Sequence, residues 1–527
     1  MTKILMVGEA TWQSTGYANY GNQLLTHLQE MGYEVAELAS FGNSHDLGAK
    51  LCLWKNYTTE PNENNPEEVE AYSACDGGHI GKWKFEYALL DFKPDVVISF
   101  RDPWVDRFIK DSVLRKFFKW VYMPTCDAIP LDAEWVATMA DADVCLTYSD
   151  WALGVLSKFK RINLYKSAPP AAEINIFKKM DKKESQNDLK LPEENFYVGT
   201  VMRNQPRKLF PNLFSSFREI NKKNSRIKLL CHTSYPDVGW DLPKLLIEYE
   251  VENSVYFMRK CDPCNFVFAS LWQGHNTICP NCNSSSISFP STNNGLERSQ
   301  LAKIYSCMDL YVQYSVCEGF GMPQIEAAYC GVSIAAVDYS AMASIVETLE
   351  GIKIQPKAFY KESETARYLA IPDDDQFAKE VLKFFEKPMS IRVYKSEKTE
   401  SLAKDNFNYD KTAQVWDEAI KISLQKNSLD WAIPERQMLF PDSSIVNSSI
   451  STFCEAVLNN EFIDLSEKEK LDLHKHLAGK MLDKNCSGLL YPISSRFERY
   501  DQEKAYLSLL SRFDKARFWE RKRAQAI

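Results

Sequence analysis

Along the N-terminal third of the chain, short apolar runs alternate with segments whose apolar residues have helical spacing. This pattern predicts strands and helices in turn. Residues 16–33 place leucine and methionine at helical spacing, and short apolar runs on either side have the length and composition of buried strands. The predicted strands of this third are residues 3–10, 34–41, 94–100, 120–124 and 143–149. Strands that alternate with helices predict a parallel sheet covered by helices on both faces.

A second series of the same kind follows the polar stretch 178–195. Its predicted strands are residues 196–204, 227–232, 310–315 and 332–338. We therefore expect an α/β protein with two doubly wound, Rossmann-like domains, a cleft between them, and ligands at the carboxyl ends of the strands.

Changes in the pattern suggest four main segments. We expect an N-terminal Rossmann-like domain over residues 1–180, a C-terminal Rossmann-like domain over residues 181–395 and a helical segment over residues 396–426. Residues 427–527 are charged and amphipathic, which predicts a helical C-terminal extension.

The composition is that of a globular protein with two or three domains: 527 residues, 45% hydrophobic and 25% charged. No window approaches the roughly 18 uncharged apolar residues of a membrane span, so we expect a soluble, cytoplasmic protein. The net charge of −8 gives no overall attraction for nucleic acid or an anionic membrane. Such a partner would need a local basic patch.

Residues 318–331, EGFGMPQIEAAYCG, follow a predicted strand and carry two glutamates on the two sides of a glycine-rich corner. Gly319 and Gly321 lie where the loop turns into a predicted helix. The N-terminus of such a helix suits a diphosphate because it offers free N–H groups and partial positive charge. The carboxylates of Glu318 and Glu326 could accept hydrogen bonds from vicinal hydroxyls of a ribose and of a sugar. For an isolated pair, the ordinary interpretation is two glutamates that cap a helix and face water; here the surrounding pattern favours ligand binding.

The same stretch resembles the E(x7)E motif of retaining GT-B glycosyltransferases of family 4, with the glycines, the proline and the helical residues all in register. Residues 198–217 resemble the strand, arginine, lysine and helix segment of that family, and residues 5–25 resemble its N-terminal glycine loop. Residues 122–135 and 140–152 resemble the acceptor-side segment of some members. The resemblance covers about residues 1–425 and implies a GT-B fold, in which residues 1–180 form the acceptor-side domain and residues 181–395 the nucleotide-sugar-binding domain. Residues 396–426 are then the crossover helix, which returns to the first domain.

The resemblance also implies roles for individual residues. The donor is expected to be a nucleoside diphosphate sugar, and no catalytic metal is expected because cationic side chains and a helix N-terminus stabilise the leaving diphosphate. The implied catalytic residues are Arg203, Lys208 and Glu318, which contacts the donor sugar. Asp127 is added because family members often carry a histidine in this segment, residues 123–130 have none, and Asp127 is their only titratable side chain that could replace it. The implied donor-binding residues are Gly16, Arg207, Gly319, Phe320, Gly321, Met322 and Glu326, the last of which binds the ribose. An alternative for Asp127 is a turn aspartate before Pro130, and an alternative for Arg203 and Lys208 is a solvated basic loop.

Four of the 14 cysteines form two C-x-x-C pairs within one short segment. Cys261 with Cys264 and Cys279 with Cys282 have the spacing of a closed tetrahedral zinc site. Four occupied positions leave none for an activated water, so we expect a structural zinc ribbon, inserted over residues 258–290. A redox pair is the alternative, and His275 between the pairs is interpreted as a polar loop residue.

The function predicted from these observations is a retaining hexosyl- or pentosyltransferase that uses a nucleoside diphosphate sugar, with UDP as the expected nucleotide. The acceptor is open. The zinc ribbon, the basic and aromatic last residues 511–527 and a resemblance to glycosyltransferases of tailed phages favour a hydroxymethylated pyrimidine in DNA, in which case the location would be the host cytoplasm. The alternatives are a glycan or small-molecule acceptor, and a non-catalytic carbohydrate- or nucleic-acid-binding protein on the same scaffold. The basic tail could equally be an amphipathic helix that packs on the first domain.

Overall fold

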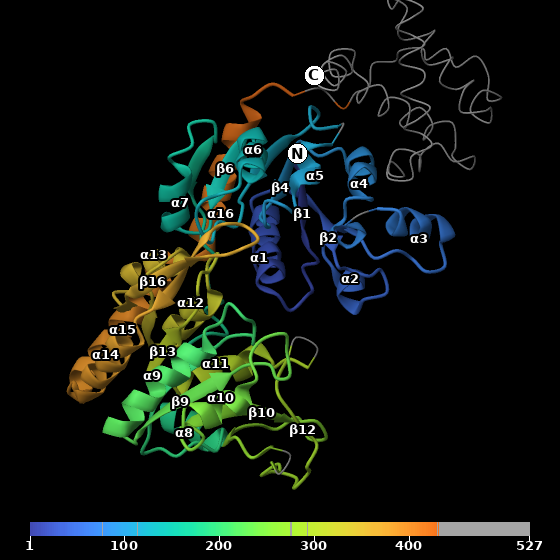
Figure 1. Cartoon of the computed structure of the whole chain (residues 1–527). Coiled ribbons are helices and arrows are strands. Elements are labelled where there is room, and N and C mark those ends of the chain that lie inside the picture. Colours follow the sequence, from blue (N-terminus) through green and yellow to red (C-terminus); the bar gives the residue numbers. More distant parts are fainter. Residues whose placement is uncertain (76, 113, 275–276, 292–293, 429–430, 432–527) are drawn as a thin grey trace, which may run out of the picture. The chain divides into compact units, whose positions relative to one another are not determined.

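The computed structural model describes residues 1–428 and Trp431, apart from residues 76, 113, 275–276 and 292–293 (Figure 1). The expected extension over residues 427–527 therefore lies almost entirely outside the described residues, as does His275. The described chain divides into two compact units. Unit 1 comprises residues 1–123, 138–145 and the described residues from 417 onward, and unit 2 comprises residues 124–137 and 146–416.

Within the described residues, the first sheet has seven strands in the order β3-β2-β1-β4-β5-β6-β7. The neighbouring pairs from β3 to β6 run parallel. The strands are β1 (Lys3–Glu9), β2 (Glu34–Ser40), β3 (Lys55–Thr58), β4 (Val96–Ser99), β5 (Lys119–Tyr122), β6 (Val144–Thr147) and β7 (Leu164–Ser167). The helices of this part of the chain are α1 (Gly16–Glu30), α2 (Leu47–Leu51), α3 (Pro66–Ser73), η1 (Gly78–Ile80, a 3-10 turn), α4 (Phe85–Phe92), α5 (Arg107–Lys110), α6 (Ala133–Asp141) and α7 (Asp150–Leu156).

The second sheet, in the described part of unit 2, has the order β11-β10-β9-β8-β13-β14-β15, and β12 pairs with β10 beside this series. The pairs from β10 to β15 run parallel, whereas β11 and β12 are antiparallel to β10. The strands are β8 (Phe196–Val201), β9 (Ile227–His232), β10 (Val255–Cys261), β11 (Val267–Leu271), β12 (Ile287–Ser288), β13 (Leu310–Gln313), β14 (Ser333–Val337) and β15 (Ile352–Ile354). The strand order reverses between β8 and β13, and such a switch point is where ligands bind in doubly wound sheets.

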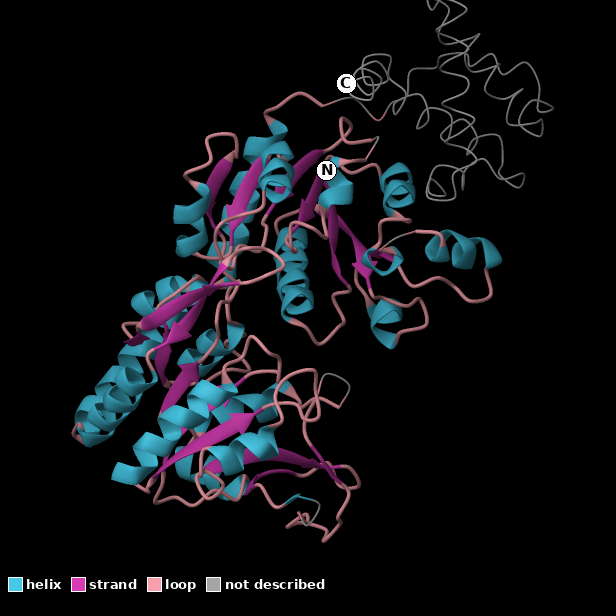
Figure 2. Ribbon diagram, viewed as in Figure 1, coloured by secondary structure: helices cyan, strands magenta, loops and turns pink. Residues whose placement is uncertain are grey.

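Helices pack against the strands of the second sheet (Figure 2, helices cyan and strands magenta). They are α8 (Lys182–Asp188), α9 (Phe210–Lys223), α10 (Leu242–Glu248), α11 (Arg298–Ser306), α12 (Met322–Tyr329), α13 (Ala341–Thr348), α14 (Asp374–Glu386) and α15 (Met389–Asn406). Helix α9 illustrates why these segments are helical. Its apolar residues Phe210, Leu213, Phe214 and Phe217 recur at spacings of three and four, and all are buried against the sheet.

The last described helix is α16 (Tyr409–Leu424), and the boundary between the two units falls within it, after Trp416. A separate two-stranded sheet, β16 (Pro356–Lys361) with β17 (Tyr368–Pro372), is not indicated by the sequence pattern because most of its residues are exposed. The prediction of an α/β protein with two parallel sheets is confirmed.

Candidate functional site

Two loops meet at the switch point of the second sheet. One follows β8 and carries Arg203, Arg207 and Lys208; the other follows β13 and carries Glu318. Their backbones pair directly: Val316 N–H donates to the carbonyl of Arg207 (3.0 Å), and Lys208 forms an isolated antiparallel bridge with Ser315. The sheet therefore brings together residues more than a hundred positions apart in the sequence.

Glu318 is the centre of a buried ionic cluster in these loops. The Lys208 ammonium donates to Oε1, and Arg207 Nη1 donates to Oε2 at 2.7 Å. Gln313 Nε2 also donates to Oε1 at 2.7 Å, and the backbone N–H of Glu318 donates to the hydroxyl of Ser340 at 2.9 Å. Burial opposes ionisation of Glu318, but the charges of Lys208 and Arg207 outweigh it and hold its pKa at about 2.

The two cations of the cluster differ in exposure. The Lys208 side chain is only 7% exposed, whereas that of Arg207 is 45% exposed. Burial lowers the pKa of Lys208, and the adjacent Glu318 carboxylate partly opposes this. Lys208 is thus a fixed internal charge, while Arg207 can also reach a ligand.

Arg203 lies in the same loop but has a different partner. It donates from Nε and Nη2 to the two carboxylate oxygens of Asp237, at 2.8 and 2.9 Å, in a side-on bidentate pair. The hydrogen bond from Arg203 holds the pKa of Asp237 well below its usual range. Asp237 follows β9, and no sequence signal points to it.

The glycine-rich corner leads directly into α12. Gly321 is the N-cap of this helix, with φ of +105°, a conformation that side chains with a Cβ rarely adopt. A Cβ on Gly319 would lie 2.5 Å from Thr125 Cγ2, so the segment that contains Thr125 lies against the corner. Phe320 is buried with its ring edge-on to Phe407, and Met322 is the first helical residue.

Glu326 lies within α12 and is held by a residue of α11. The Tyr305 hydroxyl donates to Oε2 of Glu326 at 2.8 Å. Burial raises the pKa of Glu326, and the tyrosine hydrogen bond partly opposes this. Neither Tyr305 nor Gln313 is singled out by the sequence, because their roles depend on which helices and strands become neighbours.

Asp127 lies in the segment of unit 2 that contains Thr125. Arg367 Nη1 donates to its Oδ1 at 2.5 Å, and the thiol of Cys317, the residue before Glu318, lies 3.6 Å from Oδ2. Gly16 is in unit 1, where it begins α1 after the N-cap Thr15. A Cβ on Gly16 would meet nothing within 4 Å.

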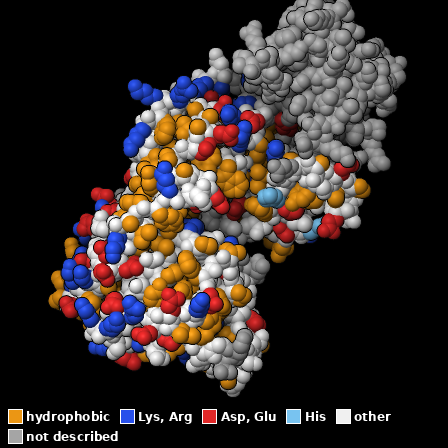
Figure 3. All heavy atoms as spheres, in the orientation of Figure 1, with side chains coloured by type: hydrophobic (Ala, Val, Ile, Leu, Met, Phe, Trp, Pro, Cys, Tyr) orange, Lys and Arg blue, Asp and Glu red, His pale blue; other side chains and the backbone are white. Residues whose placement is uncertain are grey.

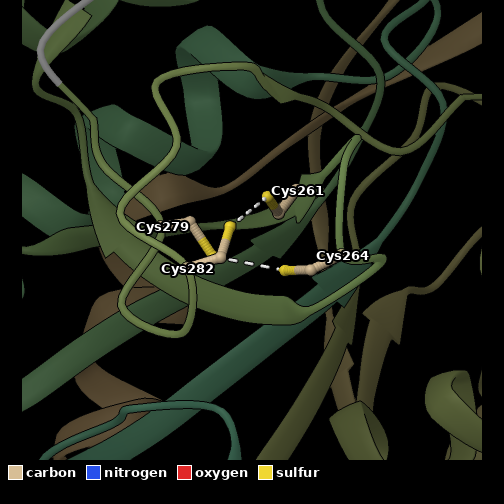
Figure 4. A group of neighbouring side chains, drawn as sticks. All are labelled: Cys261, Cys264, Cys279 and Cys282. Carbon is tan, nitrogen blue, oxygen red and sulfur yellow. Dashed lines mark hydrogen bonds between the residues drawn. The ribbon is translucent and has the colours of Figure 1, made fainter.

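The four cysteines of the two C-x-x-C pairs come together at the end of β10 (Figure 4). Their sulfur atoms all lie within 4.8 Å of one another; Cys261 and Cys282 are 3.5 Å apart, and Cys264 and Cys279 are 3.6 Å apart. Four thiolates at about 2.3 Å from a tetrahedral zinc lie about 3.8 Å from one another, whereas a disulfide requires about 2.05 Å. The cluster fits a zinc ion better than it fits disulfide bonds.

The backbone supports this interpretation because the two pairs form matching turns. The N–H of Cys261 donates to the carbonyl five residues later (2.9 Å), and the N–H of Asn265 donates to the Cys261 carbonyl (2.8 Å). In the second pair, the N–H of Cys279 donates to the carbonyl of Ser284 (2.8 Å), and the N–H of Asn283 donates to the Cys279 carbonyl (2.9 Å). Both asparagines have positive φ, 55° and 59°. The repeated C-x-x-C-N sequence is the signal for this turn.

Comparison of the sequence with protein-family models and with curated proteins gives no match. Among the described residues, no helix is both long enough and apolar enough to cross a membrane.

Several solved structures are similar to this one. Sucrose-phosphate synthase from Thermosynechococcus elongatus is 16% identical, and the match covers 80% of this chain and 98% of that chain with a TM-score of 0.57. A glycosyltransferase from Rickettsia africae is 12% identical, with 81% and 99% covered and a TM-score of 0.56. Anabaena HepE in complex with UDP and glucose is 13% identical, with 80% and 100% covered and a TM-score of 0.55. The expected GT-B fold is therefore confirmed.

Proposed function

We propose that the protein is a retaining glycosyltransferase, similar to family 4, that transfers a sugar from a nucleoside diphosphate donor, with UDP as the expected nucleotide. The observation that carries the proposal is the cluster of Arg207, Lys208 and Glu318 at the switch point of the second sheet, beside the glycine corner that begins α12. HepE, a protein of the same fold, has been solved with UDP and glucose bound.

The cluster suits the chemistry of the leaving group. When the glycosidic bond breaks, negative charge develops on the diphosphate, and preorganised cations in a partly dry site stabilise it. Arg203 and Arg207 are both partly exposed, so each can contact a phosphate, and Lys208 adds a buried positive charge from the same loop. The N–H groups at the start of α12, from Gly319 to Met322, are further donors for phosphate or sugar.

The two glutamates are proposed to hold the rest of the donor. Tyr305 occupies Oε2 of Glu326, which leaves Oε1 for a ribose hydroxyl. A carboxylate accepts about four hydrogen bonds, and Glu318 already accepts three, so one position remains for a sugar hydroxyl. Gly16 is proposed to allow close approach of a donor phosphate, and Asp127 to contact the reacting sugar.

The four-cysteine cluster is proposed to hold one structural zinc ion, with no catalytic metal at the donor site. Zinc would fix the two turns of residues 258–290 on the end of β10, because a metal site contributes its binding energy to local folding. We expect full activity in the presence of a chelator as long as elemental analysis shows that the zinc remains bound.

The acceptor is proposed to be a hydroxymethylated pyrimidine in DNA, with a glycan or small molecule as the second candidate. The two C-x-x-C-N turns favour nucleic acid, since zinc ribbons are common attachments on proteins that handle it. On the face drawn in Figure 3, however, lysine and arginine side chains are interspersed with aspartate and glutamate side chains, which is consistent with the net charge of −8. DNA binding would then depend on a local basic patch and weaken with salt.

The test is donor hydrolysis by the purified full-length protein with a panel of nucleoside diphosphate sugars. Lys208→Ala should slow the reaction by about one to three powers of ten, because it removes one charge that stabilises the leaving group. Lys222→Ala is the matched control, since Lys222 pairs with Glu219 on the surface of α9. Full activity of Lys208→Ala would refute the assignment.

Two further measurements test the stereochemistry of transfer and the identity of the acceptor. The anomeric configuration of the product, determined by NMR, distinguishes retention from inversion. Incubation with hydroxymethylcytosine DNA and with unmodified DNA, followed by nucleoside mass spectrometry, tests the acceptor. If no hexose or pentose mass is added with donors that the enzyme hydrolyses, the DNA proposal fails and a glycan acceptor remains.

A further inference from the structure

Asp237 and Arg203 differ in how strongly the protein fixes them. The Asp237 side chain is 8% exposed, whereas the Arg203 side chain is 48% exposed. Besides the two bonds from Arg203, the Asp237 carboxylate accepts hydrogen bonds from the Ser234 hydroxyl and from the N–H of Val238. Asp237 is therefore an anchored group, and Arg203 extends from it toward solvent.

The loop that carries Asp237 is also clamped to the loop that carries the cations. The Asn204 side chain donates to the carbonyl of Trp240 (2.8 Å) and accepts from its N–H (2.9 Å). The Trp240 indole N–H donates to the carbonyl of Lys208 at 2.7 Å. Gly239 lies so close that an added Cβ would be 2.5 Å from Asn204 Oδ1. The position of Asp237 is thus fixed relative to both Arg203 and Lys208.

The side-on pair leaves most of the guanidinium available. Arginine has five N–H donors in a rigid planar fork, and Asp237 uses two of them, one on Nε and one on Nη2. Three N–H donors remain, and their directions are set once the plane is fixed. A long, half-exposed side chain without this anchor would sample several rotamers.

We propose that Asp237 is a positioning residue of the donor site: it fixes the guanidinium of Arg203 so that its remaining N–H donors meet the departing diphosphate. The inference rests on the proposed function. Asp237 itself does not touch the donor and acts only through Arg203. Its effect on catalysis is one of orientation, which is realised in the transition state.

This role predicts a separation between rate and binding. In Asp237→Ala, kcat for donor hydrolysis should fall about tenfold, because the charge that meets the leaving group is no longer held in place. The Kd for UDP, measured by isothermal titration calorimetry, should stay within about threefold of wild type, since loss of the anchor is offset by loss of a negative charge near the phosphates. Asp237→Asn, which keeps one acceptor oxygen, should lie between wild type and the alanine variant.

A double-mutant cycle on kcat tests whether Asp237 acts through Arg203. In the Arg203→Ala background, Asp237→Ala should cause no further fall in kcat. Asp241→Ala is the matched control from the same loop: Asp241 accepts a hydrogen bond from the N–H of Lys244 at the start of α10, so its effect should be the same with or without Arg203.

The outcomes separate this inference from the proposed function. If wild type neither binds a nucleoside diphosphate nor hydrolyses a donor, both are wrong. If wild type is active and Arg203→Ala is impaired, unchanged kcat in Asp237→Ala refutes the positioning role alone. An equal fall in kcat in both backgrounds refutes it as well, because Asp237 would then act independently of Arg203.

Discussion

Replacing Glu318 by glutamine should destabilise unit 2 by several kcal/mol while leaving its shape almost unchanged. The substitution removes the negative charge that neutralises Lys208, whose side chain is 7% exposed. Breaking a buried ion pair by removing one partner costs about 3–5 kcal/mol, because the remaining charge is left without a counter-ion. The pKa of Glu318 gives a similar magnitude, since a fall from the ordinary 4.5 to about 2 corresponds to about 3 kcal/mol.

The lowered pKa of Glu318 also determines how its contribution to the stability of unit 2 depends on pH. The folded-state value lies below the unfolded-state value, so the stabilising contribution of Glu318 is fully present above about pH 4.5 and is lost as the pH falls toward about 2. The difference in free energy of unfolding between wild type and Glu318→Gln should therefore be constant near neutral pH and shrink over that acidic range.

Hydrogen exchange of the full-length protein, measured by mass spectrometry on peptides that cover residues 196–210 and 310–320, reports the local free energy of opening. The control is the double variant Glu318→Gln with Lys208→Met, which removes both charges; its stability should return to within about 1 kcal/mol of wild type. Arg207 can remain, since it is 45% exposed and can be hydrated. A double variant as unstable as the single one, or a single variant that loses less than about 1 kcal/mol, would show that the buried charge pair is not the cause.

Three other predictions follow from the site. Elemental analysis should find about one zinc per chain, and Cys261→Ser with Cys264→Ser should lose the metal and unfold locally; a metal-free wild-type protein would contradict the zinc assignment. Gly321→Ala should lower the melting temperature and weaken donor binding, because φ is +105° at this position, and an unchanged melting temperature would count against the strain. Glu326→Ala should raise the Kd for UDP by about tenfold or more, and Tyr305→Phe by less, as measured by titration calorimetry; equal affinity in Glu326→Ala would argue against ribose binding there.

The sequence determines those features of this protein that depend on near neighbours in the chain. Apolar runs predict β1, β2, β4, β5 and β6 of the first sheet and β8, β9, β13 and β14 of the second, because a strand buried on both faces is apolar throughout. The shorter and outer strands of both sheets are not predicted in this way. The glycine corner before α12 and the two cysteine turns are likewise local: Gly321 is required by a positive φ, and each C-x-x-C pair is closed by one short turn. The resemblance of residues 318–331 to the E(x7)E motif, which implied the GT-B fold, rests on local features of this kind.

Only the tertiary structure decides which charges become partners. The residues next to Glu318 in the sequence are compatible with a side chain that faces a ligand or water. It is buried with Lys208, 110 residues away in the sequence, because the second sheet places β8 beside β13. Arg203 is only five positions before Lys208, yet it pairs with Asp237 because β9 lies on the other side of β8. Hydrophobic periodicity specifies which face of a strand is buried but not which strand lies next to it. The ion pairs of the proposed donor site follow from strand order, and strand order is a property of the folded chain.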